Sequence, residues 1–113
     1  MNIQIFGSKK SNDSKKAERW FKERRIKYQM IDMKEKGMSR GELTSVMQAV
    51  GGLDALLDPN AKDKDTLALL GYLTDDAKLE KVLENPQLLR TPVVRNGRKA
   101  TVGYTPEVWE TWD

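Results

Sequence analysis

The 113-residue sequence contains no cysteine and no histidine. Without cysteine the chain can form no disulfide and offers no thiolate to a metal ion. Without histidine it lacks the commonest general base and the commonest metal ligand. Carboxylates remain, but no loop of the D-x-D-x-D-G type is present. We therefore expect neither a metal site nor a bound cofactor.

Long apolar stretches are also absent. No run approaches the roughly 20 residues that a membrane-spanning helix needs, and we expect no secretory signal, because no basic segment followed by an apolar one opens the sequence. The composition, 38% hydrophobic and 33% charged, is ordinary for a globular protein. We therefore expect a cytoplasmic monomer with no membrane contact, formed by one domain over residues 1–113.

Positive charge is plentiful in one place, although the net charge is only +3. The cations that crowd the first predicted helix and its flanks are Lys9, Lys10, Lys15, Lys16, Arg19, Lys22, Arg24, Arg25 and Lys27. Such a cluster fits a surface for nucleic acid or an acidic partner, or a solvated helix face. The solvated face is favoured, and no direct nucleic-acid binding is expected, since no nucleic-acid motif accompanies the charge.

The apolar pattern predicts alternating strands and helices. The predicted strands cover 3–6, 27–32, 92–95 and 99–103, and the predicted helices cover 12–25, 39–50, 64–73, 75–84 and a last one after Thr105, with a helical turn at 53–57. Ser11 or Asp13 could cap the first helix. Ser39 and Glu42 form a capping box, and Asn96-Gly97 predicts a two-residue type I′ hairpin turn.

This order, β-α-β, a helical block and β-β-α, predicts the fold class. A parallel strand pair with a right-handed crossover and an antiparallel hairpin in the same sheet give a four-stranded mixed sheet flanked by helices. The helical block, at about residues 39–84, is an insert between the two halves. The aromatic residues of these elements are expected to pack in the core or at its edge: Trp20, Trp109, Trp112, Tyr28 and Tyr104.

The turn at Ser11 connects the first strand directly to the first helix. The free backbone N–H groups of a helix's first turn point at such a position, which suits an anion or a thiolate. Small thiol-redox proteins keep a C-x-x-C there, because the helix end lowers the cysteine pKa. This chain has serine at both positions, Ser11 and Ser14.

Together the sequence resembles the arsenate reductase (ArsC)/Spx family of thioredoxin-fold proteins, over essentially the whole chain. The segments that carry the resemblance are Ile5-Phe6-Gly7-x-x-x-Ser11-x-x-Ser14-Lys15-Lys16-Ala17-x-x-Trp20-Phe21, Asn85-Pro86-Gln87-Leu88-Leu89-Arg90-Thr91-Pro92-Val93-Val94 and Asn96-Gly97-x-x-Ala100-x-Val102-Gly103-Tyr104-x-Pro106-x-x-Trp109. The resemblance implies an α/β, thioredoxin-like fold with the helical insert. It also implies a bacterial protein.

The resemblance also implies a site. The family's nucleophilic cysteine would occupy Ser11 and a second cysteine Ser14, and Pro92 corresponds to the proline held cis beside the active cysteine. Arg90, with Lys10 and Lys15, would stabilise the anion. The implied ligand is a small thiol or an oxyanion, and the implied external reductant is glutathione or thioredoxin.

The sequence departs from that pattern in three ways. Ser11 is a weakly acidic hydroxyl with no histidine to activate it, Ser14 supplies no second sulfur, and Thr91 stands where arsenate reductases of the family have an arginine before the proline. We therefore expect no arsenate reduction by this chain as written. Two origins fit equally: a natural protein that lost its redox chemistry, and a protein whose reactive cysteine was replaced by serine.

Three hypotheses about function follow. The first is a thiol oxidoreductase of glutaredoxin or arsenate-reductase type by family, silent in this cysteine-free form. The second is an Spx-like, non-catalytic regulator that binds the α-subunit of RNA polymerase, through a surface that could include the basic first helix and Gly51-Gly52. The third is a folded domain in which Ser11 only caps its helix.

Overall fold

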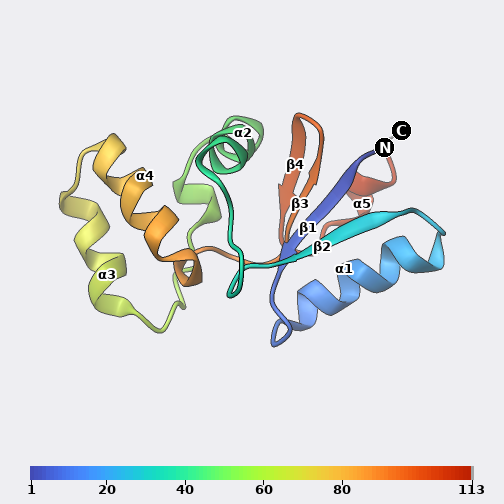
Figure 1. The fold of residues 1–113 in the computed structure, drawn as a ribbon, viewed down its shortest axis with the longest axis horizontal. Coiled ribbons are helices and arrows are strands. Elements are labelled where there is room, and N and C mark those ends of the chain that lie inside the picture. Colours follow the sequence, from blue (N-terminus) through green and yellow to red (C-terminus); the bar gives the residue numbers. More distant parts are fainter. Residues whose placement is uncertain (113) are drawn as a thin grey trace.

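The computed structural model describes residues 1–112. Figure 1 shows its strands in the middle, with helices on both sides. The elements are β1 (Ile3–Gly7), α1 (Asn12–Glu23), β2 (Tyr28–Asp32), α2 (Arg40–Val50), η1 (Asp54–Leu56), α3 (Lys64–Leu69), η2 (Leu70–Tyr72), α4 (Asp75–Glu84), η3 (Pro86–Leu88), β3 (Val93–Asn96), β4 (Lys99–Val102) and α5 (Pro106–Trp109), where η marks a 3₁₀ turn.

The four strands form one mixed sheet in the order β2-β1-β3-β4. β1 and β2 are parallel, with Gly7 opposite Asp32 at their carboxyl ends, and β3 is antiparallel to both β1 and β4. α1 supplies the crossover that a parallel pair requires. The predicted four-stranded mixed sheet is therefore confirmed.

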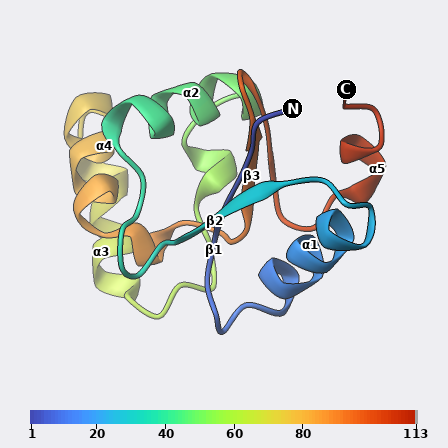
Figure 2. The same ribbon diagram turned by 45° about the vertical axis from the view of Figure 1, so that its right-hand side comes forward.

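Alternate residues of the strands feed two separate clusters of buried side chains. Ile3, Ile5 and Val94 pack with α1 and with Trp109 and Trp112. Phe6 and Val93 face the other way and pack with side chains of the helical insert. Figure 2 shows the same division, with α1 and α5 on one side of the sheet and α2, α3 and α4 on the other. The sheet thus joins the insert to the rest of the molecule.

α1 buries one side of its surface and ends earlier than predicted. Ala17, Trp20 and Phe21 are buried, as the helical spacing indicated. The helix stops at Glu23 rather than at Arg25, because Arg25 adopts a left-handed conformation with φ of 58°. Beyond the C-cap residue Arg24, the Arg25 N–H donates to the Lys22 carbonyl and the Ile26 N–H donates to the Phe21 carbonyl, which is the Schellman arrangement of a helix end.

The insert follows the predicted order of helices. Ser39 and Glu42 form the expected capping box at the start of α2, and Gly51 ends that helix with φ of 93°. The predicted helix over 64–73 is correct only in part, because it changes into a 3₁₀ turn at Leu70. Leu70 and Val82 carry the insert's buried face into the core.

The C-terminal half contains a correction of one residue. Asn96 pairs with Lys99, so the two turn residues are Gly97 and Arg98 and not Asn96-Gly97. Only Gly97 has a positive φ, which is the pattern of a type II′ turn, whereas type I′ needs positive φ at both central residues. The type I′ prediction was therefore wrong.

The last helix is short, and no side chain caps its start. α5 has four residues, and Thr105 precedes it without a capping hydrogen bond from its side chain. The helix is held by its tryptophan, since the buried Trp109 indole Nε1–H donates to the Thr101 hydroxyl at 2.8 Å. Across residues 1–112, no helix is both long and apolar enough to cross a bilayer.

Candidate functional site at the Ser11 turn

The Ser11 turn lies between the end of β1 and the start of α1. Ser11 has extended backbone angles, φ −87° and ψ 119°, and is the N-cap of α1. Its Oγ accepts a hydrogen bond from the Ser14 N–H at 3.1 Å. This N–H is one of the free donors at a helix start that would otherwise be directed at a bound anion. Because the Ser11 hydroxyl accepts the Ser14 N–H, this N–H is not free to bind an anion.

Ser14 is held more tightly than Ser11. It is 1% exposed, and its Oγ accepts the backbone N–H of Ser8 at 3.1 Å. A Cβ on Gly7 would lie 2.8 Å from that Oγ and 3.0 Å from the Ser14 Cβ. Glycine at position 7 is thus what lets β1 pass this close to the helix. The second serine holds the turn in place and faces no solvent.

Pro92 lies at the same end of the sheet as this turn. The Thr91–Pro92 peptide bond is cis, which is the geometry that the resemblance to the family implies. Phe6 pairs with Val93, so the buried proline follows the register to a place beside Gly7. Its carbonyl accepts the Gly103 N–H at 2.8 Å, which fixes this corner of the sheet.

Arg90 is not joined to the two serines by any hydrogen bond or ion pair among the described residues. Its side chain is exposed, and its backbone N–H donates to the Leu56 carbonyl at 2.7 Å. One guanidinium nitrogen, Nη2, lies near Gly103: it is 3.8 Å from the point where a Cβ on that glycine would lie. The role expected for Arg90, stabilising an anion at Ser11, stays a prediction.

Two hollows border the Ser11 turn, and both include Ser8. The first, of about 540 Å³, lies where the insert meets the sheet and is lined by Ser8, Met33, Lys34, Asp58, Pro86, Gln87, Leu89 and Thr91. Asp58 lies in the segment between η1 and α3, and it is not among the site residues expected from the sequence. The one signal for this hollow was Thr91, because it precedes the proline.

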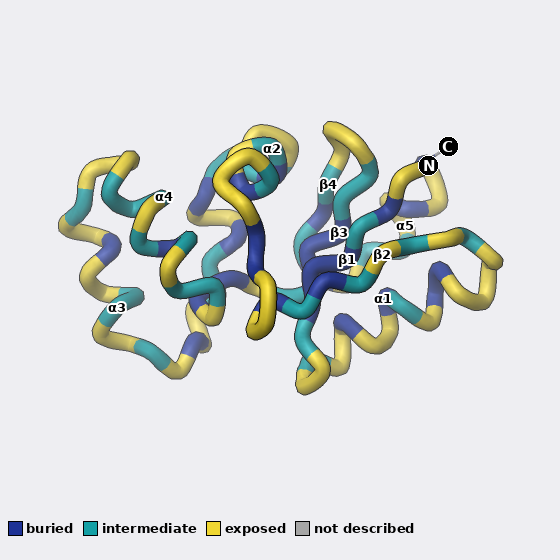
Figure 3. Tube along the Cα trace, in the orientation of Figure 1, coloured by how far each residue is buried: buried dark blue, intermediate teal, exposed yellow. Residues whose placement is uncertain are grey.

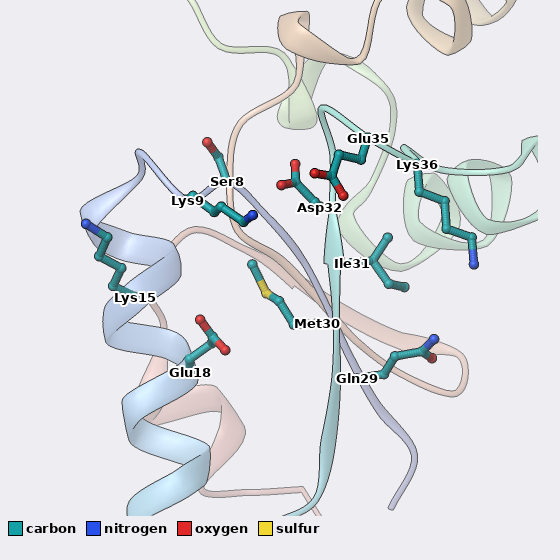
Figure 4. Close-up of a pocket in the computed structure, with 10 residues that line it drawn as sticks. All are labelled: Ser8, Lys9, Lys15, Glu18, Gln29, Met30, Ile31, Asp32, Glu35 and Lys36. Atoms are coloured by element: carbon teal, nitrogen blue, oxygen red, sulfur yellow. The ribbon is translucent and has the colours of Figure 1, made fainter.

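The second hollow, of about 550 Å³, lies between α1 and β2. Figure 4 shows Lys15 and Glu18 on the helix side, Met30 between helix and strand, and Asp32 at the end of β2. The full lining carries three lysines and three acids: Lys9, Lys15, Lys36, Glu18, Asp32 and Glu35. Charge of both signs gives this hollow no preference for a simple anion or cation.

Perturbed ionisable groups lie away from the turn. Burial, and then the hydrogen bond to Glu18, raise the pKa of Tyr28, but Tyr28 begins β2 whereas the turn lies near Asp32, at the other end of that strand. Hydrogen bonds from the Thr66 hydroxyl and N–H lower the pKa of Asp63. Asp63 caps α3 in the insert. Neither shift contributes to chemistry at Ser11.

No group of three or more acidic side chains within residues 1–112 is arranged to hold a metal ion. The geometry of the site is therefore that of a helix start, a nearby cis proline and two hydroxyls. Such a helix start lowers the pKa of a cysteine placed there. With serine the same arrangement satisfies backbone donors.

Comparisons with known proteins agree with this geometry. The sequence model of the ArsC family matches residues 6–112. Global transcriptional regulator Spx 2 of Oceanobacillus iheyensis is 29% identical over 92% of this chain and 78% of its own length. Regulatory protein MgsR of Bacillus subtilis is 27% identical over 81% of this chain and 75% of its own length.

Among solved structures, an arsenate reductase from Vibrio cholerae superposes with a TM-score of 0.83 and 26% identity, over 96% of this chain and 94% of that one. An ArsC family related protein from Bacteroides fragilis gives a TM-score of 0.85 at 21% identity, over 100% and 98% of the two chains. The thioredoxin-like α/β fold expected from the sequence is confirmed. From the match over residues 6–112, this chain belongs to the ArsC family.

Proposed function

We propose that this chain keeps the site of an ArsC-family thiol oxidoreductase without its chemistry, and that it acts by binding a protein. The observation that supports the first half is the state of the two serines. The Ser11 Oγ takes up the Ser14 N–H, and the Ser14 Oγ takes up the Ser8 N–H. The hydroxyls hold the turn in a folded state, in place of the thiols that the family's redox chemistry uses.

The unaltered chain lacks both the electron donor and the base that chemistry at this site would need. Reduction of an oxyanion or a disulfide by this kind of site passes two electrons from thiolates, which serine does not supply. A serine nucleophile would need an adjacent base, and the chain has no histidine. The unaltered protein is therefore expected to show no glutathione- or thioredoxin-dependent reduction of arsenate or of a small disulfide. Measurable turnover in either assay would contradict the proposal.

A single substitution tests whether the turn still activates a nucleophilic thiol at position 11. The Ser11→Cys variant should carry a thiol of lowered pKa, because it faces the start of α1. Iodoacetamide should modify it near pH 6 at least about tenfold faster than Ala49→Cys, an exposed position in the last turn of α2. Equal rates in the two variants would show that the turn does not activate a thiol.

The same variant identifies the external reductant that such a site would use. Incubated with oxidised glutathione, Ser11→Cys should gain one glutathione by mass spectrometry, with the other half leaving as reduced glutathione. Reduced thioredoxin or an excess of reduced glutathione should then release the bound glutathione. The unaltered chain is the control, since it has no cysteine to modify. Failure of Ser11→Cys to form the mixed disulfide would remove the thiol-oxidoreductase half of the proposal.

For the protein partner, the α-subunit of bacterial RNA polymerase is the candidate, which would place the chain in the cytoplasm. Two relatives are named as regulators, one of them a global transcriptional regulator. A hollow of about 320 Å³ follows the end of α2, and it is lined by Met47, Gly51, Gly52, Leu53, Asp54, Ala55, Asp75 and Lys78. Its mixture of apolar and charged side chains suits a small protein contact.

Calorimetric titration with the C-terminal domain of the polymerase α-subunit tests this partner. Ala55→Arg places a long side chain in the hollow and should weaken binding by at least about tenfold. Ala68→Arg adds the same side chain at an exposed position of α3 and serves as the matched control. Absence of binding by the unaltered chain, or equal loss in both variants, would count against RNA polymerase as the partner.

A further inference from the structure

The positive charge of this chain is concentrated in one segment. Residues 9–27 carry nine lysines and arginines against three acidic residues, a net charge of +6, whereas the rest of the chain carries eleven against fourteen. Among the ion pairs formed within residues 1–112, none includes a cation of this segment. The fold therefore leaves this charge without close partners of opposite sign.

Exposed cations lie along α1 and at its end, with Lys15 on the side toward β2 and Lys16 on the side toward Tyr104. The helix turns Ser14, Ala17, Trp20 and Phe21 inward, and the cations that remain exposed along it and just beyond its end are Lys15, Lys16, Arg19, Lys22, Arg24 and Arg25. Figure 3 shows exposed stretches along α1 alternating with buried ones that face the sheet. α1 and the insert lie on opposite sides of the sheet (Figure 2). This surface is thus separate from the hollow at the end of α2.

The outer face of α1 is hollowed where it meets the segment before α5. The hollow, of about 390 Å³, is lined by Lys16, Arg19, Trp20, Glu23, Arg24 and Tyr104. Three of these six residues are cations and one is an acid. We call these six residues the α1 basic hollow.

Two of the three cations are held by aromatic rings. The Arg24 guanidinium lies 4.0 Å from the centre of the Trp20 ring, and its Nη1 donates to the Trp20 carbonyl at 3.1 Å. The Lys16 ammonium lies 5.9 Å from the centre of the Tyr104 ring. Side chains that are ordered before binding lose less conformational entropy when they bind. Part of the positive charge of the hollow, above all that of Arg24, is therefore ordered before a partner binds.

The same contacts favour a carboxylate-bearing occupant over a nucleic acid. Base recognition on a single strand uses open aromatic faces for stacking. Trp20 is 7% exposed beneath Arg24, and the more exposed ring of Tyr104 lies under the Lys16 ammonium. Glu23 in the hollow would repel a continuous line of phosphates, whereas a protein surface of mixed charge can pair with it. Complementary charge of this kind speeds association and selects the partner.

We infer that the α1 basic hollow is a docking site for an acidic segment of a protein partner. Lys16 and Arg19 pair with carboxylates of that segment, and Arg24, held on Trp20, forms the rim. The inference does not rest on the function proposed above, because it concerns the other side of the sheet and no residue of the Ser11 turn or of the α2 hollow.

Fluorescence anisotropy with a labelled peptide of ten glutamates tests this site at about 0.15 M salt, where charges beyond roughly 8 Å are screened. The double variant Lys16→Glu/Arg19→Glu should raise the Kd of the peptide by about tenfold or more. The control Lys62→Glu/Arg98→Glu makes the same change of net charge at exposed positions elsewhere, and should change the Kd by less than about twofold. Far-UV circular dichroism checks that both variants fold.

Each other outcome would overturn the inference. Equal weakening in the two double variants would mean that only the net charge attracts the peptide. A ten-nucleotide oligothymidylate that binds more tightly than the peptide, with the same dependence on Lys16 and Arg19, would identify a nucleic-acid surface instead. No measurable peptide binding by the unaltered chain would leave the cluster as a solvated helix face.

Discussion

At the scale of single residues, serine at positions 11 and 14 changes what the family's site does. A thiolate at the N-cap would take the charge-stabilising effect of the helix start. The Ser11 hydroxyl instead satisfies a backbone donor as an ordinary N-cap. The buried Ser14 hydroxyl satisfies another donor, on the loop that precedes it. The two residues have therefore acquired structural roles that can be measured.

Ser14→Ala should lower the free energy of unfolding by about 1–2 kcal/mol. Removing the Ser14 Oγ leaves the Ser8 N–H without its partner in a place where water has little access, which costs about 1–3 kcal/mol. The better helix propensity of alanine offsets a part of this loss. Urea denaturation measures the change.

The matched control for Ser14→Ala is Ser8→Ala. The Ser8 Oγ accepts the Lys10 N–H at an exposed position, where water can replace it, so the change should stay within about 0.5 kcal/mol. Equal stability losses in the two variants would contradict the assignment of a special role to the buried hydroxyl.

At the scale of elements, local signals predicted the starts of α1 and α3 better than the ends of these two helices, whereas the ends of α2 and α4 were predicted correctly. The Ser11 cap and the Ser39–Glu42 capping box lie within four residues of sequence and need no distant contact. The end of α1 depends on Arg25 adopting positive φ, for which glycine is the usual sequence signal. The hairpin shifted by one residue, because Gly97 suits type II′ at the first turn position as well as type I′ at the second.

In the candidate site too, features set by local sequence were predicted and features set by distant contacts were not. The Ser11 turn could be predicted from its own segment, and the cis bond before Pro92 from the resemblance to the family. The place of Arg90 near Gly103, and of Asp58 in the same hollow as Thr91, depends on how distant segments pack together. No spacing in the sequence encodes that packing. The sequence therefore predicts the turn but not the hollow beside it.

Arg25→Gly should stabilise the protein relative to Arg25→Ala by about 1 kcal/mol. Both substitutions remove the same charge, but only glycine adopts the left-handed conformation of position 25 without a steric cost. The Schellman hydrogen bonds at the end of α1 then form without strain. Thermal denaturation of the two variants measures the difference. A more stable Arg25→Ala variant would refute this account of the helix end.

The cap of α3 predicts a pH dependence. The Thr66 hydroxyl and backbone N–H donate to Asp63 and lower the pKa of its carboxyl. A lowered pKa in the folded state stabilises the fold above the ordinary aspartate value of about 3.9, and that contribution is lost as pH falls through the folded-state pKa. Carbon-13 chemical shifts should therefore give an Asp63 titration midpoint below about 3.9.

Thr66→Val tests the cause of this shift. It removes the hydroxyl that donates to Asp63 and keeps the backbone N–H, so the midpoint should move upward toward the ordinary value. Thr44→Val, at an exposed position of α2, should leave the Asp63 midpoint in place. A midpoint that stays low in Thr66→Val would assign the lowered pKa to the Thr66 backbone N–H and the Gln87 side chain instead.

At the scale of the whole molecule, the sheet divides the chain into two regions of different character. α1 and α5 cover one face and carry the unneutralised positive segment, while the insert covers the other and holds the hollow after α2. The buried clusters on the two faces meet only through the strands, where Phe6 and Val94 point to opposite sides. This arrangement raises the question of whether the regions unfold together.

The chain supplies separate probes for the two regions. All three tryptophans belong to the cluster of α1 and α5, so their fluorescence reports on that face of the sheet. Far-UV circular dichroism includes α2, α3 and α4 of the insert. Because adjacent residues of β1 and β3 feed both clusters, loss of either cluster should disrupt the sheet and with it the other. We therefore expect the two probes to give coincident urea curves, as in two-state unfolding.

The Leu56→Ala variant tests whether the two regions unfold together. Leu56 is fully buried in the insert's cluster, and truncation of such a leucine costs about 2–5 kcal/mol. If the sheet couples the two faces, fluorescence of the distant tryptophans must shift to lower urea by the same amount as circular dichroism. Ala68→Gly, at an exposed position of α3, should cost only about 1 kcal/mol. A Leu56→Ala protein that loses helix signal while its tryptophans stay buried would show that the insert unfolds on its own, and that the sheet carries no coupling between its faces.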